Sequence, residues 1–226
     1  MHKKIFPVSI ITILATLSFS FARQTLPAWD SSSVPPEIVI DIGHGGIDPG
    51  KVGINNALEK DINLAIGLYL QEYMQASGYK VSLTRDTDIS LADSNASNQK
   101  LSDLKNRTNK INQMAPIALI SIHQNSYPEE KVSGTQVFHS ASEESKLLAS
   151  FIQDQCRRIL NPDNRRQIKQ NTDYYLFRNV TCPAVIVECG FLSNYQEANL
   201  LITEEYQKKT AWAIHMGTVQ FLKSLE

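Results

Sequence analysis

Short apolar runs rich in β-branched residues alternate along this chain with segments of helical periodicity, which limits the folds available to it. The predicted strands are residues 37–42, 79–84, 117–122, 135–139 and 184–187. Apolar residues spaced by three and four predict helices over about 58–77, 101–114, 147–159 and 204–225. Strands that alternate with helices at these lengths favour the α/β class, as a single three-layer domain with a largely parallel, mixed sheet flanked by helices.

The first 36 residues differ in character from the rest of the chain. Two lysines precede an uncharged apolar run over residues 5–21, and a small-x-small pattern follows. We expect residues 1–22 to be an export signal, either cleaved or retained as an anchor, because 17 apolar residues lie at the lower limit of a membrane span of about 17–25. Residues 23–36, rich in Pro and Ser, are expected to be a flexible tether. The folded domain would then occupy residues 37–226, outside the cytoplasmic membrane.

Charge and cysteine content exclude several classes of protein. Lys and Arg number 22 against 23 Asp and Glu, and the positive charges are scattered, which argues against nucleic acid as a partner. We expect no membrane contact beyond the N-terminal signal, because no other segment is apolar enough to span a bilayer. Cys156, Cys182 and Cys189 are too few for a disulfide framework and are expected to be small buried side chains.

Ionisable residues follow the predicted strands at the points where the apolar runs stop. His123 and Glu188 come directly after the third and fifth predicted strands, and His44 follows the first strand after Gly43. Because the carboxyl ends of parallel strands meet at one edge of an open sheet, these side chains are expected to lie close together. The Gly-rich loop 43–56 would carry Glu59, at the start of the next helix, back over the same edge.

Two imidazoles and one carboxylate suit zinc and leave a fourth position open for water, which is the arrangement of catalytic zinc. The second carboxylate could then act as a general base. This set predicts zinc-assisted hydrolysis of an unactivated carbonyl compound at the carboxyl ends of the strands. Spacing alone leaves open whether Glu59 or Glu188 binds the metal.

Neighbouring polar residues could support this site. Asn125, two residues beyond His123, is expected to support the metal site or to contact substrate. Arg85 is expected to contact a peptide carboxylate or to pair with a local acid. Asp48, inside the Gly-rich loop, is expected to be a turn residue.

The chain resembles the zinc-dependent N-acetylmuramoyl-L-alanine amidase family (amidase type 3) in four segments that occur in the family's order. These segments are IVIDIGHGGIDPG at 38–50, LEKDINLAI at 58–66, SIHQNS at 121–126 and VIVECGFLSN at 185–194. The resemblance covers the chain from about residue 37 to its end. Its departures are Ile42, where the family usually has Pro, and Cys189, which occupies a variable position.

This resemblance implies that His44, Glu59 and His123 bind one catalytic Zn²⁺ and that Glu188 is the catalytic carboxylate. It also implies hydrolysis of the amide between the lactyl group of N-acetylmuramic acid and the L-alanine of the stem peptide, in peptidoglycan muropeptides. The alternatives are a zinc peptidase or deacetylase that acts on another cell-wall bond, and a non-catalytic wall-binding scaffold.

Within the family, the stretches at 91–112 and 133–155 most resemble the spore germination-specific amidases. That similarity implies action in the cell wall or spore cortex, on the route to muramic-δ-lactam. No separate wall-binding module is recognisable in the chain. We therefore expect an exported accessory protein to supply targeting or activation.

Overall fold

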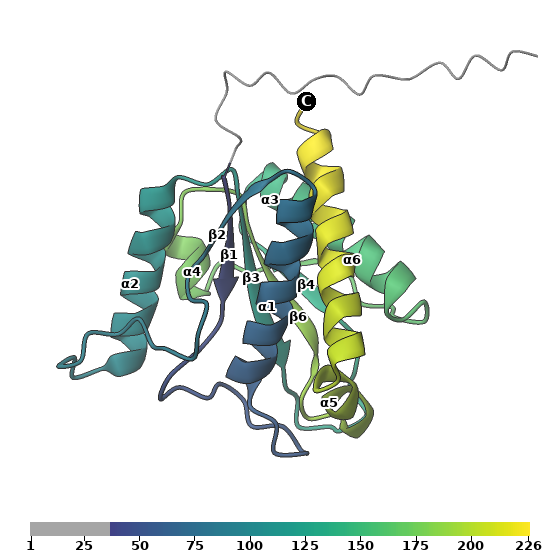
Figure 1. Cartoon of the computed structure of the whole chain (residues 1–226). Helices are drawn as coiled ribbons and strands as arrows, with labels where there is room; N and C mark the ends of the chain where they lie inside the picture. The colour runs from purple at the N-terminus through teal and green to yellow at the C-terminus, as the bar shows by residue number, and fades with distance from the viewer. Residues whose placement is uncertain (1–36) are drawn as a thin grey trace, which may run out of the picture. The chain divides into compact units, whose positions relative to one another are not determined.

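The computed structural model describes residues 37–226, so the predicted signal peptide and tether lie outside the described residues. Strands and helices alternate along most of this length (Figure 1). In chain order the elements are β1 Glu37–Ile42, α1 Glu59–Ala76, β2 Lys80–Leu83, α2 Gln99–Met114, β3 Ala118–Asn125, β4 Gln136–His139, α3 Glu143–Ile159, β5 Lys169–Gln170, α4 Tyr175–Asn179, β6 Ala184–Phe191, α5 Tyr195–Leu201 and α6 Glu204–Lys223.

The strands form one sheet in the order β2-β1-β3-β6-β4-β5. Neighbours from β2 to β6 are parallel, β4 runs antiparallel to β6, and β5 is parallel to β4. The sheet is therefore mixed but largely parallel, which confirms the predicted α/β class.

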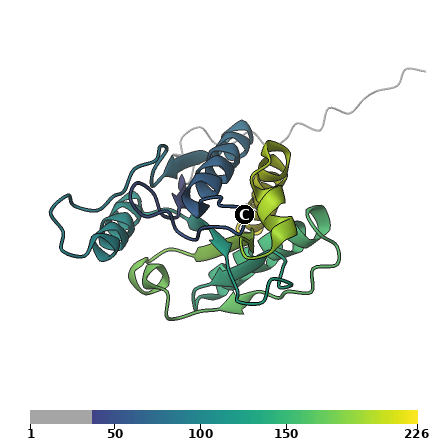
Figure 2. The same ribbon diagram turned by 90° about the horizontal axis from the view of Figure 1, so that it is seen from below.

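Helices cover both faces of the sheet, and alternate residues of β1 face opposite layers. Ile38, Ile40 and Ile42 join one apolar cluster with α1, α3 and α6, whereas Val39 joins a second cluster with α2 and α4. The helices α1 and α6 lie side by side on the first face (Figure 2). Burial on both faces explains why β1 reads as a continuous apolar run.

The two central strands extend further than their apolar runs predict. β3 continues to Asn125 and β6 to Phe191, so His123 and Glu188 lie within strands and do not follow them. Backbone pairing between parallel strands depends on peptide groups, so it persists where the side chains turn polar. Three short elements, β5, α4 and α5, were not predicted from the sequence.

The structure also describes the cysteines and tests the helices for a membrane span. The three cysteines are free, with Cys156 and Cys189 buried and Cys182 half-buried. Among residues 37–226, no helix combines the length and apolarity needed to cross a bilayer.

Candidate metal centre

Three predicted ligands from different elements meet beside the central strands. His44 lies in the loop after β1, Glu59 begins α1, and His123 lies in β3. Glu59 Oε1 is 3.2 Å from His44 Nε2 and 3.0 Å from His123 Nδ1. One ligand atom from each residue lies within 4.8 Å of the others. Because donors about 2.0–2.2 Å from a tetrahedral zinc lie roughly 3.4 Å apart, this donor set fits zinc in both chemistry and spacing.

Glu59 is held as an ionised carboxylate between the two histidines. Burial raises the pKa of its carboxyl group, but hydrogen bonds and charges from His123 and His44 outweigh burial and lower the pKa. Its oxygens also accept backbone N–H groups, from Lys51 at 2.8 Å and Gln124 at 3.0 Å. An ionised, backbone-fixed carboxylate is a suitable ligand for a divalent cation.

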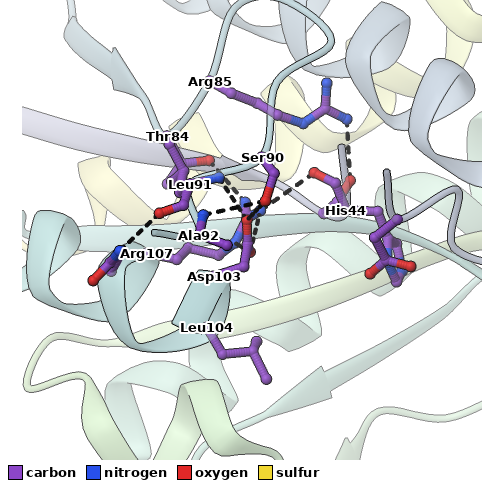
Figure 3. Close-up of polar contacts among 12 residues, drawn as sticks. His44, Thr84, Arg85, Ser90, Leu91, Ala92, Asp103, Leu104 and Arg107 are labelled. Atoms are coloured by element: carbon purple, nitrogen blue, oxygen red, sulfur yellow. Dashed lines mark hydrogen bonds and ion pairs between the residues drawn. The ribbon is translucent and has the colours of Figure 1, made fainter. Parts of the chain in front are cut away.

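His44 sits in an uncommon backbone conformation, with φ of 60°. Two buried arginines hold the carbonyls of this segment (Figure 3). Arg85 donates to Ile42 and Gly43, each at 3.1 Å, and Arg107 donates to Ile42 at 2.8 Å and to His44 at 3.3 Å. Left-handed backbone at a non-glycine residue costs energy, so these donors help to fix it.

Arg107 is in turn fixed by two carboxylates. It donates to Asp41 Oδ1 at 2.7 Å and to Asp103 Oδ2 at 2.9 Å. Burial raises the pKa of the Asp41 carboxyl, but the charge of Arg107 and a hydrogen bond from Ser121 outweigh burial and lower the pKa. The loop that carries His44 therefore rests on a buried ion pair.

Asp48 is a site residue that the sequence analysis did not identify. Its backbone forms a turn with Gly45, as predicted. In addition, the Oδ2 atom of its side chain lies 2.8 Å from His44 Nδ1. A carboxylate only accepts, so Nδ1 is the donor and Nε2 is left facing Glu59. Burial lowers the pKa of the His44 imidazole, but Glu59 and Asp48 outweigh burial and raise the pKa to about 9.

Glu188 stands beside the three candidate ligands. It is the register partner of His123 in the neighbouring strand. Its Oε2 atom is buried and has no hydrogen-bond partner among the described residues. Burial raises the pKa of this carboxyl to about 7, with Glu59 adding to the rise and His123 and His44 opposing it. The group can therefore exchange a proton near neutral pH.

A cavity of about 270 Å³ opens in front of this group and includes Glu188, His44 and His123 in its wall. Apolar atoms dominate the rest of the wall, from Leu104 of α2 and Tyr174 beside α4 among others. A concave, mostly apolar pocket with a few convergent polar groups is typical of a substrate site.

The two remaining predicted residues lie elsewhere. Arg85 is buried, and all its hydrogen bonds go to backbone carbonyls, including Thr87 at 3.0 Å and Lys60 at 2.7 Å. It supports the loop beneath His44. Asn125 Oδ1 accepts the N–H of the next residue at 2.7 Å, and Asn125 lines a separate surface hollow.

Comparisons with known proteins agree with this geometry. A family model described as N-acetylmuramoyl-L-alanine amidase matches residues 38–219. The chain is 36% identical to a germination-specific N-acetylmuramoyl-L-alanine amidase of Bacillus subtilis strain 168, over 98% of this chain and 96% of that protein.

Solved structures give the same result. The CwlD amidase from Clostridioides difficile, solved in complex with the GerS lipoprotein, is 39% identical with a TM-score of 0.81, over 84% of this chain and 99% of that one. The catalytic domain of CwlV, an N-acetylmuramoyl-L-alanine amidase from Bacillus (Paenibacillus) polymyxa var. colistinus, is 29% identical with a TM-score of 0.71, over 83% of this chain and 98% of that one.

Proposed function

This chain belongs to the N-acetylmuramoyl-L-alanine amidase family and is a peptidoglycan amidase, and from this premise we propose that it is a zinc enzyme with Glu188 as its catalytic carboxylate. The zinc ligands are His44, Glu59 and His123. The bond cleaved joins the lactyl group of N-acetylmuramic acid to the L-alanine of the stem peptide. One observation carries the proposal: His44 and His123 share a cavity wall with Glu188, and the Glu59 carboxylate lies between the two histidines.

Zinc, when bound, would supply Lewis-acid polarisation of the scissile carbonyl and stabilise the negative charge that develops on its oxygen. Glu188 Oε2 accepts a proton from the attacking water, whose oxygen bonds to the carbonyl carbon. The carbon–nitrogen bond then breaks, and Glu188 returns the proton to the amine of the leaving L-alanine. A carboxyl with a pKa near the working pH can perform both transfers.

The residues around the ligands fix the geometry of this step. Asp48 accepts from His44 Nδ1, so the tautomer that presents a Nε2 lone pair is favoured. Arg85 and Arg107 hold the backbone carbonyls of residues 42, 43 and 44. These contacts keep His44 aimed at the metal position before any substrate arrives.

We further propose a role in spore cortex, outside the cytoplasmic membrane, on the route to muramic-δ-lactam. Support comes from the germination-specific relative in Bacillus subtilis, which matches almost the whole chain. An exported accessory protein is proposed as a partner, because the similar amidase from Clostridioides difficile was solved in complex with a lipoprotein.

The test uses the zinc-loaded full chain with defined muropeptides and mass-spectrometric detection. We expect wild type to release the intact stem peptide, and Glu188→Gln to retain zinc but to turn over about 10²–10⁴ times more slowly. Glu143→Gln, on the exposed first turn of α3, is the matched control and should behave as wild type.

Other products identify the alternatives. Release of a single amino acid would indicate a peptidase, and loss of acetate would indicate a deacetylase. A zinc-loaded wild type that binds muropeptides without cleaving them, alone or with an exported partner, would indicate a scaffold.

A further inference from the structure

One face of α2 forms a wall of the cavity in front of the metal centre. Lys100, Asp103, Leu104 and Arg107 are spaced by three and four residues along the helix, and all four line the cavity. A sequence stripe of this spacing is normally an apolar core face. Here three of the four residues are charged, so this face of the helix is suited to bind a polar or charged group.

The lower part of this stripe is rigid. Arg107 is anchored to Asp41 beneath the His44 loop. Asp103 pairs with Arg107 and also accepts the N–H of Leu91 at 2.7 Å and the hydroxyl of Ser90 at 3.2 Å (Figure 3). The position of the helix relative to the metal centre is therefore fixed, and so is the start of the Lys100 side chain.

Lys100 and Arg107 differ in what they can offer a ligand. The Arg107 side chain is only 3% exposed, and its donors go to carboxylates, carbonyls and the Thr84 hydroxyl. The Lys100 side chain is 74% exposed, with an ion pair to Asp48 Oδ1 at 3.2 Å. Among the described residues that line this cavity, these are the only lysine and the only arginine. An ammonium group has three donors, so Lys100 retains capacity for an anion that enters the cavity.

Lys100 also stands between two hollows. Beyond the cavity of the metal centre lies a second hollow of about 340 Å³, which shares Asp48, Lys100 and Asp103 with the first and adds residues such as Ser90 and Asn98. A bound chain that places its reacting carbonyl at the metal centre can therefore continue past Lys100.

We propose that Lys100 determines specificity by binding a free carboxylate of the stem peptide, at the residue that follows the L-alanine. The inference rests on the proposed function, since it takes the scissile amide to lie at the metal centre. Peptidoglycan stems carry a D-glutamyl residue at this position, linked through its side chain so that the α-carboxylate is free or amidated.

The distances agree with this assignment. Lys100 reaches Asp48, and Asp48 reaches His44, so the ammonium lies one ion pair and one hydrogen bond from a metal ligand. The path from the Lys100 ammonium through the Asp48 carboxylate to the His44 ring covers roughly 10 Å at most. Two extended residues span about 7 Å, and a charge-assisted hydrogen bond adds about 2.8 Å. The substrate carboxylate would replace or share the Asp48 contact.

The test compares two synthetic substrates that differ at one group: N-acetylmuramoyl-L-alanyl-D-glutamate and its α-carboxamide, N-acetylmuramoyl-L-alanyl-D-isoglutamine. We expect the zinc-loaded full chain to prefer the carboxylate by about tenfold in kcat/KM. Lys100→Met should bring the ratio to about one, and Lys100→Arg should retain it. Lys105→Met, on the exposed side of the same helix, is the control and should keep the wild-type ratio. A ratio is used because general damage to turnover cancels from it.

A tenfold preference that survives in Lys100→Met, or no preference in wild type, would overturn the inference. The binding of the two N-acetylmuramoyl dipeptides to zinc-loaded Glu188→Gln should also be measured by titration calorimetry, since that measurement needs no turnover. A Lys100-dependent carboxylate preference in binding, without cleavage by wild type, would retain the subsite and reject the proposed function. Equal binding of both dipeptides would reject the subsite.

Discussion

His123 of β3 and Glu188 of β6 are register partners on adjacent parallel strands, and both line the same cavity. The pairing places an imidazole that can bind a metal beside a carboxyl that has one buried, unpartnered oxygen. Neither residue needs a loop to reach the other. The proposed proton-transfer group is thus positioned by the sheet itself, which is a more precise support than a flexible loop.

The buried Glu188 carboxylate should cost stability in the metal-free protein. Its pKa in the folded state is about 7 and its ordinary value is 4.5, so its ionisation destabilises the fold as the pH rises from 4.5 through 7. Glu188→Gln cannot ionise. We expect the metal-free variant to be about 1 kcal/mol more stable than wild type at pH 8, after allowance for solvent in the cavity. This corresponds to a rise in Tm of about 2–4 °C.

Scanning calorimetry at several pH values checks this expectation. The difference should shrink as the pH falls and vanish near about pH 3.5, where the carboxyl is protonated in both the folded and the unfolded state. A Tm difference that is absent at pH 8, or that is equally large at both pH values, would show that charge burial is not its origin. Glu143→Gln, which is exposed, controls for loss of a surface charge.

Asp48 should contribute to metal affinity without touching the metal. Its carboxylate accepts from His44 Nδ1 at 2.8 Å and so orients the imidazole. Removal of such a supporting partner typically weakens metal binding 10–100-fold. We expect Asp48→Ala to bind zinc about 10–100 times more weakly in competition with a chelator, while Asp61→Ala, an exposed residue of α1, matches wild type. Unchanged zinc affinity in Asp48→Ala would refute this role.

Much of the fold could be predicted because its signals are local. The β-branched runs mark strands that are buried on both faces, as β1 shows with Ile38 and Val39 in different clusters. Strand order and the antiparallel direction of β4 could not be predicted in this way. They depend on pairing between distant segments, which leaves no periodic signal in the chain.

The site shows the same division. His44, His123 and Glu188 were predicted because ionisable residues stand out where apolar runs stop, and Glu59 because the Gly-rich loop returns its helix to the same edge of the sheet. The residues that hold these side chains in place were not predicted. Charged residues are mostly exposed, and nothing in the local sequence indicates that Arg107 is buried. It is buried because strand-end carbonyls and Asp41 need donors, and only the fold brings these groups together.

Gly50 is expected to be indispensable to the metal centre for a steric reason. Its φ is 67°, and a Cβ atom there would lie 2.6 Å from Glu59 Oε2 and 2.7 Å from His44 Cδ2. Gly50→Ala should therefore displace two of the proposed ligands and weaken zinc binding by more than about tenfold. Gly78→Ala provides a matched control, because its φ is also positive, at 87°, but its Cβ would meet open space. It should cost about 1 kcal/mol of stability and leave zinc affinity intact, so equal zinc loss in both variants would exclude the steric explanation.

The buried pair of Asp41 and Arg107 should contribute to the acid sensitivity of the fold. The pKa of Asp41 is lowered from its ordinary 3.8, so its stabilising contribution is complete above pH 3.8 and is lost as the pH falls through the lowered value. Asp41→Asn leaves Arg107 without this partner and should cost about 3 kcal/mol at pH 7. Urea denaturation measures the free energy of unfolding, and its difference between wild type and Asp41→Asn should stay constant from pH 7 to about pH 4 and become smaller towards pH 3. The control Asp154→Asn removes surface ion pairs of α3 and should cost less than about 1 kcal/mol at every pH. If the difference in free energy of unfolding stays constant down to pH 3, the cost of Asp41→Asn comes from packing and not from charge.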